Sequence, residues 1–222
     1  METAKVIAQL GPLVITDVVV TSWGLTLLLW LGSWLITRRL RLDPGPLQTA
    51  LEGIVSLIEA AVEEVLPEQA PQVMPFTGTL WLFLVLANLV GLSPGLHSPT
   101  RDLSATAALA VLVFLATHWF GIRSQGWANY LRHYLLPVPL LLPFHLISEI
   151  TRTVALAVRL FGNIMSLETA ALLVLLVGGL LVPVPLLLLH IVEALVQAYI
   201  FGMLALIYIA GGIQAQQQRQ KD

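Results

Sequence analysis

The sequence predicts an all-α integral membrane protein, with about five membrane helices and one amphipathic helix in a single domain over residues 1–222. Hydrophobic residues make up 57% of the chain and charged residues only 11%, which is too little charge to cover a soluble domain of this length. Uncharged stretches of about 20 residues recur, and a helix of that length crosses a bilayer. The chain has no cysteine, so disulfides and thiol chemistry are excluded.

Two elements are expected in the N-terminal third. Charged Asp17 and Arg38 bracket the first span, at about 18–37, and tryptophans lie near both of its ends. The opening "METAKVIAQL" lacks the basic region of a cleavable signal peptide, so we expect this span to stay in the membrane. At about 46–66, apolar residues recur at helical spacing against several glutamates. This amphipathic helix is too acidic to insert, so we expect it at the interface or packed on its neighbours.

The remaining elements are apolar. A second span is expected at about 74–96, a third at about 103–122, and two long helices at about 143–181 and 186–212, which form a hairpin through the "PVP" turn at 183–185. The first hairpin helix would have roughly 39 residues and a length of about 58 Å. Because a bilayer core is only about 30 Å thick, this helix must be tilted, broken or extended beyond the core.

Basic residues in the short connections predict the orientation. They cluster after the first span, after the third span and after the last helix, at Arg38, Arg39, Arg41, Arg123, Arg132, Arg219 and Lys221. With five spans, all three clusters lie on one side. The sequence therefore predicts an N-terminus outside and a C-terminus in the cytoplasm.

Polar side chains interrupt the apolar C-terminal half, and each is expensive at mid-bilayer, at about 2.5–3.5 kcal/mol for an ionised group. They are His145, Glu149, Arg152, Arg159, Asn163, Glu168, His190, Glu193 and Gln197. At helical spacing Arg152, Arg159 and Asn163 form one stripe, with Glu168 on the opposite side of that helix. The last three members of the set share a second stripe, on the last helix.

The chemistry of these groups differs. Arginine does not release its proton under ordinary conditions, so Arg159 can act only as a fixed charge, whereas the carboxylates and imidazoles can titrate. This combination suits an ion path that contains an electrostatic barrier. Structural alternatives remain open: Arg159 can pair with a buried acid, Glu149 and Arg152 can neutralise each other, and Glu168 can bond His190. His118 is interpreted as a satisfied interior histidine, and the "HIVE" segment is not a zinc-protease motif.

Several motifs resemble subunit a of the membrane sector of rotary F-type ATP synthase. "LAVRLFGNI" at 156–164 is similar to the segment around that family's essential arginine, and "VQAYIFGMLALIYIAGG" at 196–212 resembles its last helix. Weaker likeness at "LWLFLVLANLVGLSP", "PTRDLSATAALAV" and "DPGPLQTALEGIV" extends over nearly the whole chain in the expected order.

The resemblance implies a non-catalytic stator subunit with two ion half-channels beside a ring of c subunits. Arg159 would separate the half-channels, so that proton flow must turn the ring, while Asn163, Glu168, His190 and Gln197 match family positions along the path. The implied partners are the c-ring, the b-subunit peripheral stalk, the rest of the ATP synthase and membrane lipid, with no nucleic acid, cofactor or metal. The implied location is the bacterial plasma (inner) membrane.

Some positions depart from the family pattern. Relatives commonly have an acid where this chain has His145, and Glu193 is an extra acid on the path. These departures leave the arginine mechanism intact, and they also fit a sodium-translocating branch of the family. Two other functions remain open from the residues alone: a secondary transporter for an anionic solute, and a structural membrane protein whose buried charges only pair.

Overall fold

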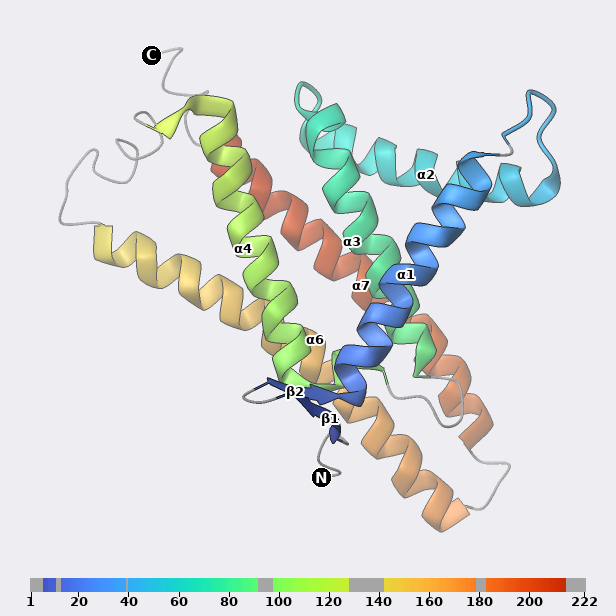
Figure 1. Ribbon diagram of the computed structural model, residues 1–222. Helices are drawn as coiled ribbons and strands as arrows, with labels where there is room; N and C mark the ends of the chain where they lie inside the picture. Colours follow the sequence, from blue (N-terminus) through green and yellow to red (C-terminus); the bar gives the residue numbers. More distant parts are fainter. Residues whose placement is uncertain are drawn as a thin grey trace.

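The computed structural model describes residues 6–10, 13–38, 40–91, 98–127, 142–178 and 183–214. Helices make up nearly all of this part of the chain (Figure 1), which confirms the predicted all-α membrane class. One element was not predicted: strands β1 (Val6–Leu10) and β2 (Leu13–Thr16) form a short antiparallel hairpin before the first helix. The strands are rich in β-branched and other apolar residues, a composition that permits an extended backbone as readily as a helix.

Helix α1 (Asp17–Thr37) leads from the hairpin to the opposite end of the molecule, and helix α2 (Pro46–Val65) lies across that end (Figure 1). Pro46 occupies the first turn of α2, where its missing N–H is not needed. Val62 is fully buried, whereas Leu57 is 73% exposed. The amphipathic helix therefore packs one part of its surface on its neighbours and leaves apolar side chains open at the end of the bundle.

Helix α3 (Ala70–Val90) returns through the bundle, and the short 3-10 helix η1 (Pro99–Arg101) leads into helix α4 (Leu103–Gln125). The sequence predicted that the α3 span starts at about residue 74, but the helix begins earlier, at Ala70. Pro71 suits a first helical turn, so the helix extends beyond the purely apolar run. Asp102 caps α4, because its Oδ1 accepts a hydrogen bond of 2.7 Å from the backbone N–H of Ser104.

Helices α6 (Leu142–Gly178) and α7 (Pro183–Gln214) are the two longest, and they run antiparallel and obliquely across the other helices (Figure 1). The prediction of a proline turn at 183–185 was wrong, since α7 already begins at Pro183. Proline is tolerated in the first turn of a helix because the N–H groups there have no intrahelical acceptor. The 37 residues of α6 give it a length of about 55 Å.

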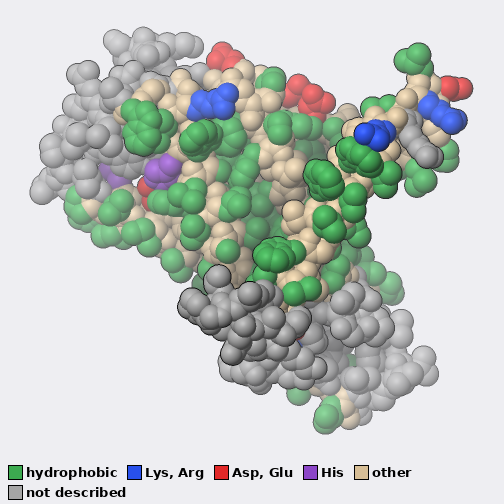
Figure 2. Space-filling model, in the orientation of Figure 1, with side chains coloured by type: hydrophobic (Ala, Val, Ile, Leu, Met, Phe, Trp, Pro, Cys, Tyr) green, Lys and Arg blue, Asp and Glu red, His purple; other side chains and the backbone are tan. Residues whose placement is uncertain are grey.

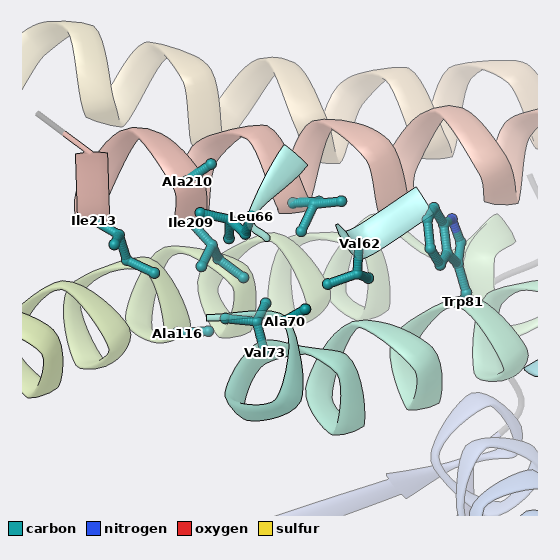
Figure 3. Close-up of a cluster of buried hydrophobic side chains, with 10 residues drawn as sticks. Val62, Leu66, Ala70, Val73, Trp81, Ala116, Ile209, Ala210 and Ile213 are labelled. Carbon is teal, nitrogen blue, oxygen red and sulfur yellow. The ribbon is translucent and has the colours of Figure 1, made fainter. Parts of the chain in front are cut away.

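Two hydrophobic clusters hold the bundle together. One joins α2, α3, α4 and α7 (Figure 3), and its members are Val62, Leu66, Ala70, Val73, Trp81, Ala116, Leu206, Ile209, Ala210 and Ile213. The other joins α3, α4, α6 and α7, with Leu84, Leu160 and Ala205 among its fully buried members. Helices α6 and α7 are thus fixed against α3 and α4.

Four helices are long and apolar enough to cross a membrane when only the described residues are considered: Asp17–Thr37, Ala70–Val90, Leu103–Ser124 and Leu187–Ile213. Several side chains in the second half of α6 lie outside the described residues, so α6 as the fifth span stays a prediction. Figure 2 shows hydrophobic side chains over much of the visible surface, with charged side chains gathered along its upper rim. This distribution is typical of a protein surrounded by lipid.

Candidate functional site

Arg159 lies on an exposed face of α6. The residues that share this face at helical spacing are small and also exposed: Ala155, Gly162 and Ser166. No ion pair joins Arg159 to an acid within the described part of the chain. The alternative that Arg159 pairs with a buried acid of this chain therefore gains no support, and its charge points away from the bundle.

One turn beyond Arg159, Asn163 links α6 to α7. Its Nδ2 donates a hydrogen bond to Oε1 of Gln197. Gln197 is only 1% exposed, and its own Nε2 has no hydrogen-bond partner among the described residues. A buried amide N–H without an acceptor is costly, so this position is suited to a water molecule or another polar group.

His190 and Glu193 precede Gln197 on α7. His190 is 5% exposed, and its Nε2 has no hydrogen-bond partner in the described part of the chain, while Glu193 is half-buried. Glu168 belongs to α6, but its side chain lies outside the described residues, so its contact with His190 stays a prediction. His190 and Gln197 thus form a buried polar stripe on α7, and the described residues leave one ring nitrogen and one amide nitrogen of this stripe available for a hydrogen bond.

A polar network that the sequence did not reveal lies beside this stripe. Asn88 Nδ2 donates to the carbonyl oxygen of Ala194 over 3.1 Å, and its Oδ1 accepts from the hydroxyl of Thr100 over 2.8 Å. Ser98 lies 2.6 Å from Thr100 and donates to the carbonyl oxygen of Ala87 over 2.7 Å. All three side chains are buried. Only the isolated asparagine in an apolar span could have indicated this network.

A partly enclosed cavity of about 210 Å³ lies between α4, the first half of α6 and the end of α7. His145, Glu149 and Arg152 line it, as do His118 of α4 and Tyr208 of α7. His118 Nε2 lies 3.4 Å from Glu149 Oε2, and the Arg152 guanidinium carbon lies 5.8 Å from the centroid of the Tyr208 ring. The structure therefore brings the predicted site residues His145, Glu149 and Arg152 together around one cavity. It adds His118 and Tyr208, which the sequence did not assign to the site.

The fold and these groups define an integral membrane protein in which a fixed cation and two sets of titratable side chains share a pair of tilted helices. Such an arrangement is that of an ion-translocating membrane subunit. Residues 19–210 match the family model described as "ATP synthase A chain". The chain belongs to this family.

Curated relatives agree with this assignment. The chain is 67% identical over 220 residues to "ATP synthase subunit a 2" of Pelobacter propionicus, an alignment that covers 99% of this chain and 96% of the relative. It is 62% identical over 206 residues to "ATP synthase subunit a 1" of Hahella chejuensis, with 93% and 88% covered. With "ATP synthase subunit a" of Legionella pneumophila it shares 55% over 214 residues, with 96% and 93% covered.

The resemblance inferred from the arginine motif is therefore confirmed, and with it the role of the chain as an ion-channel stator and membrane subunit of a bacterial ATP synthase. The solute-transporter and purely structural alternatives are set aside.

Proposed function

We propose that Arg159 is the fixed charge that separates two proton half-channels and faces the carboxylates of a passing c-subunit ring. The supporting observation is its position on an exposed face of α6, with no acid paired to it in the described part of the chain. A guanidinium attracts a deprotonated carboxylate and cannot itself carry a proton across. Protons must then stay on the ring to pass Arg159.

The surface around Arg159 suits a closely packed helical partner. Ala155, Gly162 and Ser166 leave room beside it, and a Cβ added at Gly162 would meet no atom within 4 Å. On α7 the exposed side chains include Val192 and Val196, at 57% and 48%. Small residues allow membrane helices to approach closely. This face is the proposed docking surface for the c-ring.

The polar stripe between α6 and α7 is the proposed half-channel on the outer side. It comprises Asn163, Glu168, His190, Glu193 and Gln197. His190 Nε2 and Gln197 Nε2 have no hydrogen-bond partner among the described residues, which supports the proposal because buried polar groups of this kind usually bond ordered water. Water and titratable groups together would carry protons from the outer surface toward Arg159.

The cavity between α4, α6 and α7 is the proposed access route on the other side, with His145, Glu149 and Arg152 on its walls. The cavity borders the C-terminal ends of α4 and α7, which lie at the opposite end of the molecule from the β1–β2 hairpin (Figure 1). We place the C-terminus in the cytoplasm and the N-terminus outside, because the predicted loops with excess Lys and Arg lie on the C-terminal side.

The remaining assignments follow from membership of the complex. The subunit would be non-catalytic and multi-pass in the bacterial inner membrane, with the b-subunit peripheral stalk as a second neighbour. Helix α1 supports a position at the lipid or against another subunit: Leu25 is its one buried residue among those described. Exposed Trp23 and Trp30, at 67% and 63%, suit lipid contact.

Replacement of Arg159 tests the proposal. Arg159→Ala should abolish ATP-driven proton pumping and proton-driven synthesis while the complex still assembles, because the side chain is exposed on the surface of α6. Arg159→Lys keeps a positive charge at this position, so the assembled complex should keep part of its ATPase activity. The matched control is Arg123→Ala at the exposed end of α4, which should couple normally. Normal coupling in Arg159→Ala would refute the proposed role.

The ion needs a separate measurement. We propose protons, and sodium is the alternative for the same path. Purified complex in liposomes should acidify or alkalinise the lumen on ATP addition at the same rate with and without added sodium. Uptake of radioactive sodium that survives a protonophore would instead establish sodium as the coupling ion and leave the role of Arg159 in place.

A further inference from the structure

We infer that His118 and Glu149 form a proton-loading pair on the wall of the α4–α6–α7 cavity, which holds one shared proton between the two side chains. The inference rests on the proposed function and adds to it a residue, His118, that lies on a helix outside the α6–α7 hairpin. Its side chain and that of Glu149 are 26% and 22% exposed, so both are held by the fold and still reachable from the cavity.

Hydrogen-bond geometry fixes the state of the imidazole. His118 Nδ1 lies 2.8 Å from the carbonyl oxygen of Phe114. A carbonyl oxygen only accepts hydrogen bonds, so Nδ1 carries a hydrogen. In a neutral ring Nε2 is then a bare acceptor, and Nε2 is the atom that faces Glu149 Oε2 at 3.4 Å.

At 3.4 Å the two atoms lie at ion-pair distance, longer than a formed hydrogen bond, and their contact is favourable when the pair carries one proton. Without it, a lone pair of Nε2 would face a carboxylate oxygen. With it, the pair is either an imidazolium beside a carboxylate or an imidazole that accepts from a carboxylic acid. The arrangement therefore stores a proton at a defined position, and it can release that proton only to another acceptor in the cavity or on the ring.

The other groups around the cavity favour a proton over a metal ion. His145 lies one turn before Glu149 on α6, Arg152 lies nearly one turn after it, and Tyr208 faces them from α7. The guanidinium is a permanent positive charge that repels a second cation at short range. A site with one carboxylate, two imidazoles and an arginine is poor in the anionic oxygen ligands that sodium requires, whereas the His118–Glu149 pair can share a proton.

The transfer step involves only N–H and O–H bonds. When the ring turns in the synthesis direction, a protonated ring carboxylate donates its proton toward the pair, which passes its own proton to a cavity water. The water becomes hydronium and carries the charge to the medium. In the hydrolysis direction the same bonds form and break in reverse, with hydronium loading the pair.

Proton pumping by the complete ATP synthase in liposomes tests the pair. The initial rate is recorded with a pH-sensitive dye while the pH on the C-terminal side of the subunit is varied from mildly acid to mildly alkaline. His118→Gln and Glu149→Gln should each lower the rate by at least about tenfold, since a positioned proton donor typically contributes about 10²–10⁴-fold. Each should also change the dependence of the rate on that pH, but not on the pH of the opposite side.

A double variant separates proton transfer from simple packing. His118→Leu with Glu149→Leu replaces both members of the pair by apolar side chains, so neither is left without the other, and Arg152 stays on the wall of a partly open cavity. The complex should therefore assemble. We expect its pumping rate to stay as low as in the single variants. A double variant with the wild-type rate and pH dependence would overturn the inference, because the pair would then be only structural.

Matched controls identify which statement fails. Trp119 is next to His118 in the chain, but its side chain is 64% exposed and does not line the cavity. The Trp119→Phe complex should therefore pump normally. If Arg159→Ala abolishes coupling while every His118 and Glu149 variant pumps as wild type, only this inference fails. If the complex moves sodium and no protons, the inference is overturned while the stator role stands. If Arg159→Ala couples normally, the proposed function itself fails.

Discussion

Gly202 on α7 has the tightest surroundings among the described glycines, and its replacement by alanine should disrupt the contact between α7 and α3. A Cβ at this position would lie 1.8 Å from Nε1 of Trp81, 2.2 Å from Cδ1 and 2.4 Å from Cε2. Non-bonded heavy atoms are comfortable at about 3.5–4.0 Å. The indole or the helix must therefore move by roughly 1.5 Å or more.

Trp81 has little freedom to give way. It is 6% exposed, its ring stacks on Tyr199 with centroids 6.1 Å apart, and its Nε1 donates to the backbone carbonyl of Tyr199 over 3.3 Å. Moving the indole would break these contacts together. Overpacking a close-packed interior costs about 1–3 kcal/mol, and the loss of one hydrogen bond adds about 1 kcal/mol. We expect Gly202→Ala to destabilise the subunit by about 2–4 kcal/mol.

The assay is the amount of subunit in assembled, detergent-solubilised complex, together with the temperature at which it dissociates. Gly202→Ala should lower both, and it should cost little further when Trp81→Ala is already present, since the clashing indole is then absent. Gly53→Ala on α2 is the control, because its Cβ would meet nothing within 4 Å and alanine favours a helix. Wild-type assembly and thermal stability in Gly202→Ala would refute this account of the α3–α7 contact.

Three further predictions follow from the polar contacts. Asn88→Ala should destabilise the subunit by about 1–3 kcal/mol, measured as thermal dissociation of the complex, because two hydrogen bonds are lost in a buried place; an unchanged dissociation temperature would contradict this. Gln197→Leu should lower the pumping rate, but it should lower the rate little further when Asn163→Leu is already present, because the two amides act as one unit; independent, multiplying losses would argue against such a unit. Asp102→Ala should cost about 1 kcal/mol of stability by removing the cap of α4, with exposed Asp43→Ala as the neutral control.

Much of the fold could be predicted because it depends on periodic and compositional signals. The apolar runs locate α1, α3 and α4, and the glutamates on one side of α2 mark it as amphipathic. Helix boundaries were harder to predict. The sequence placed the α3 span from about residue 74 and a turn at 183–185, yet Pro71 and Pro183 each lie in the first turn of a helix, where proline is tolerated. The hairpin of β1 and β2 has no polar alternation that would distinguish it from a membrane segment.

The candidate site divides in the same way. Arg159 could be predicted because a permanent charge in an apolar run is unfavourable without a function. The partner of Glu149 could not be predicted from the sequence. His118 lies 31 residues earlier in the chain, and only the packing of α4 on α6 brings the two side chains together. The bonds of Asn88 to Thr100 and Ala194 likewise depend on tertiary contacts between segments that have no spacing rule in common.

The length of α6 has a consequence for how its sequence maps onto space. If its 37 residues lie wholly within a core of about 30 Å, the helix axis is inclined by about 57° to the bilayer normal. Each residue then advances about 0.8 Å in depth but about 1.3 Å sideways. Glu149 and Arg159, ten positions apart, would differ by about 8 Å in depth and about 13 Å laterally. Position along α6 therefore acts mainly as a lateral coordinate, so two access routes can open side by side.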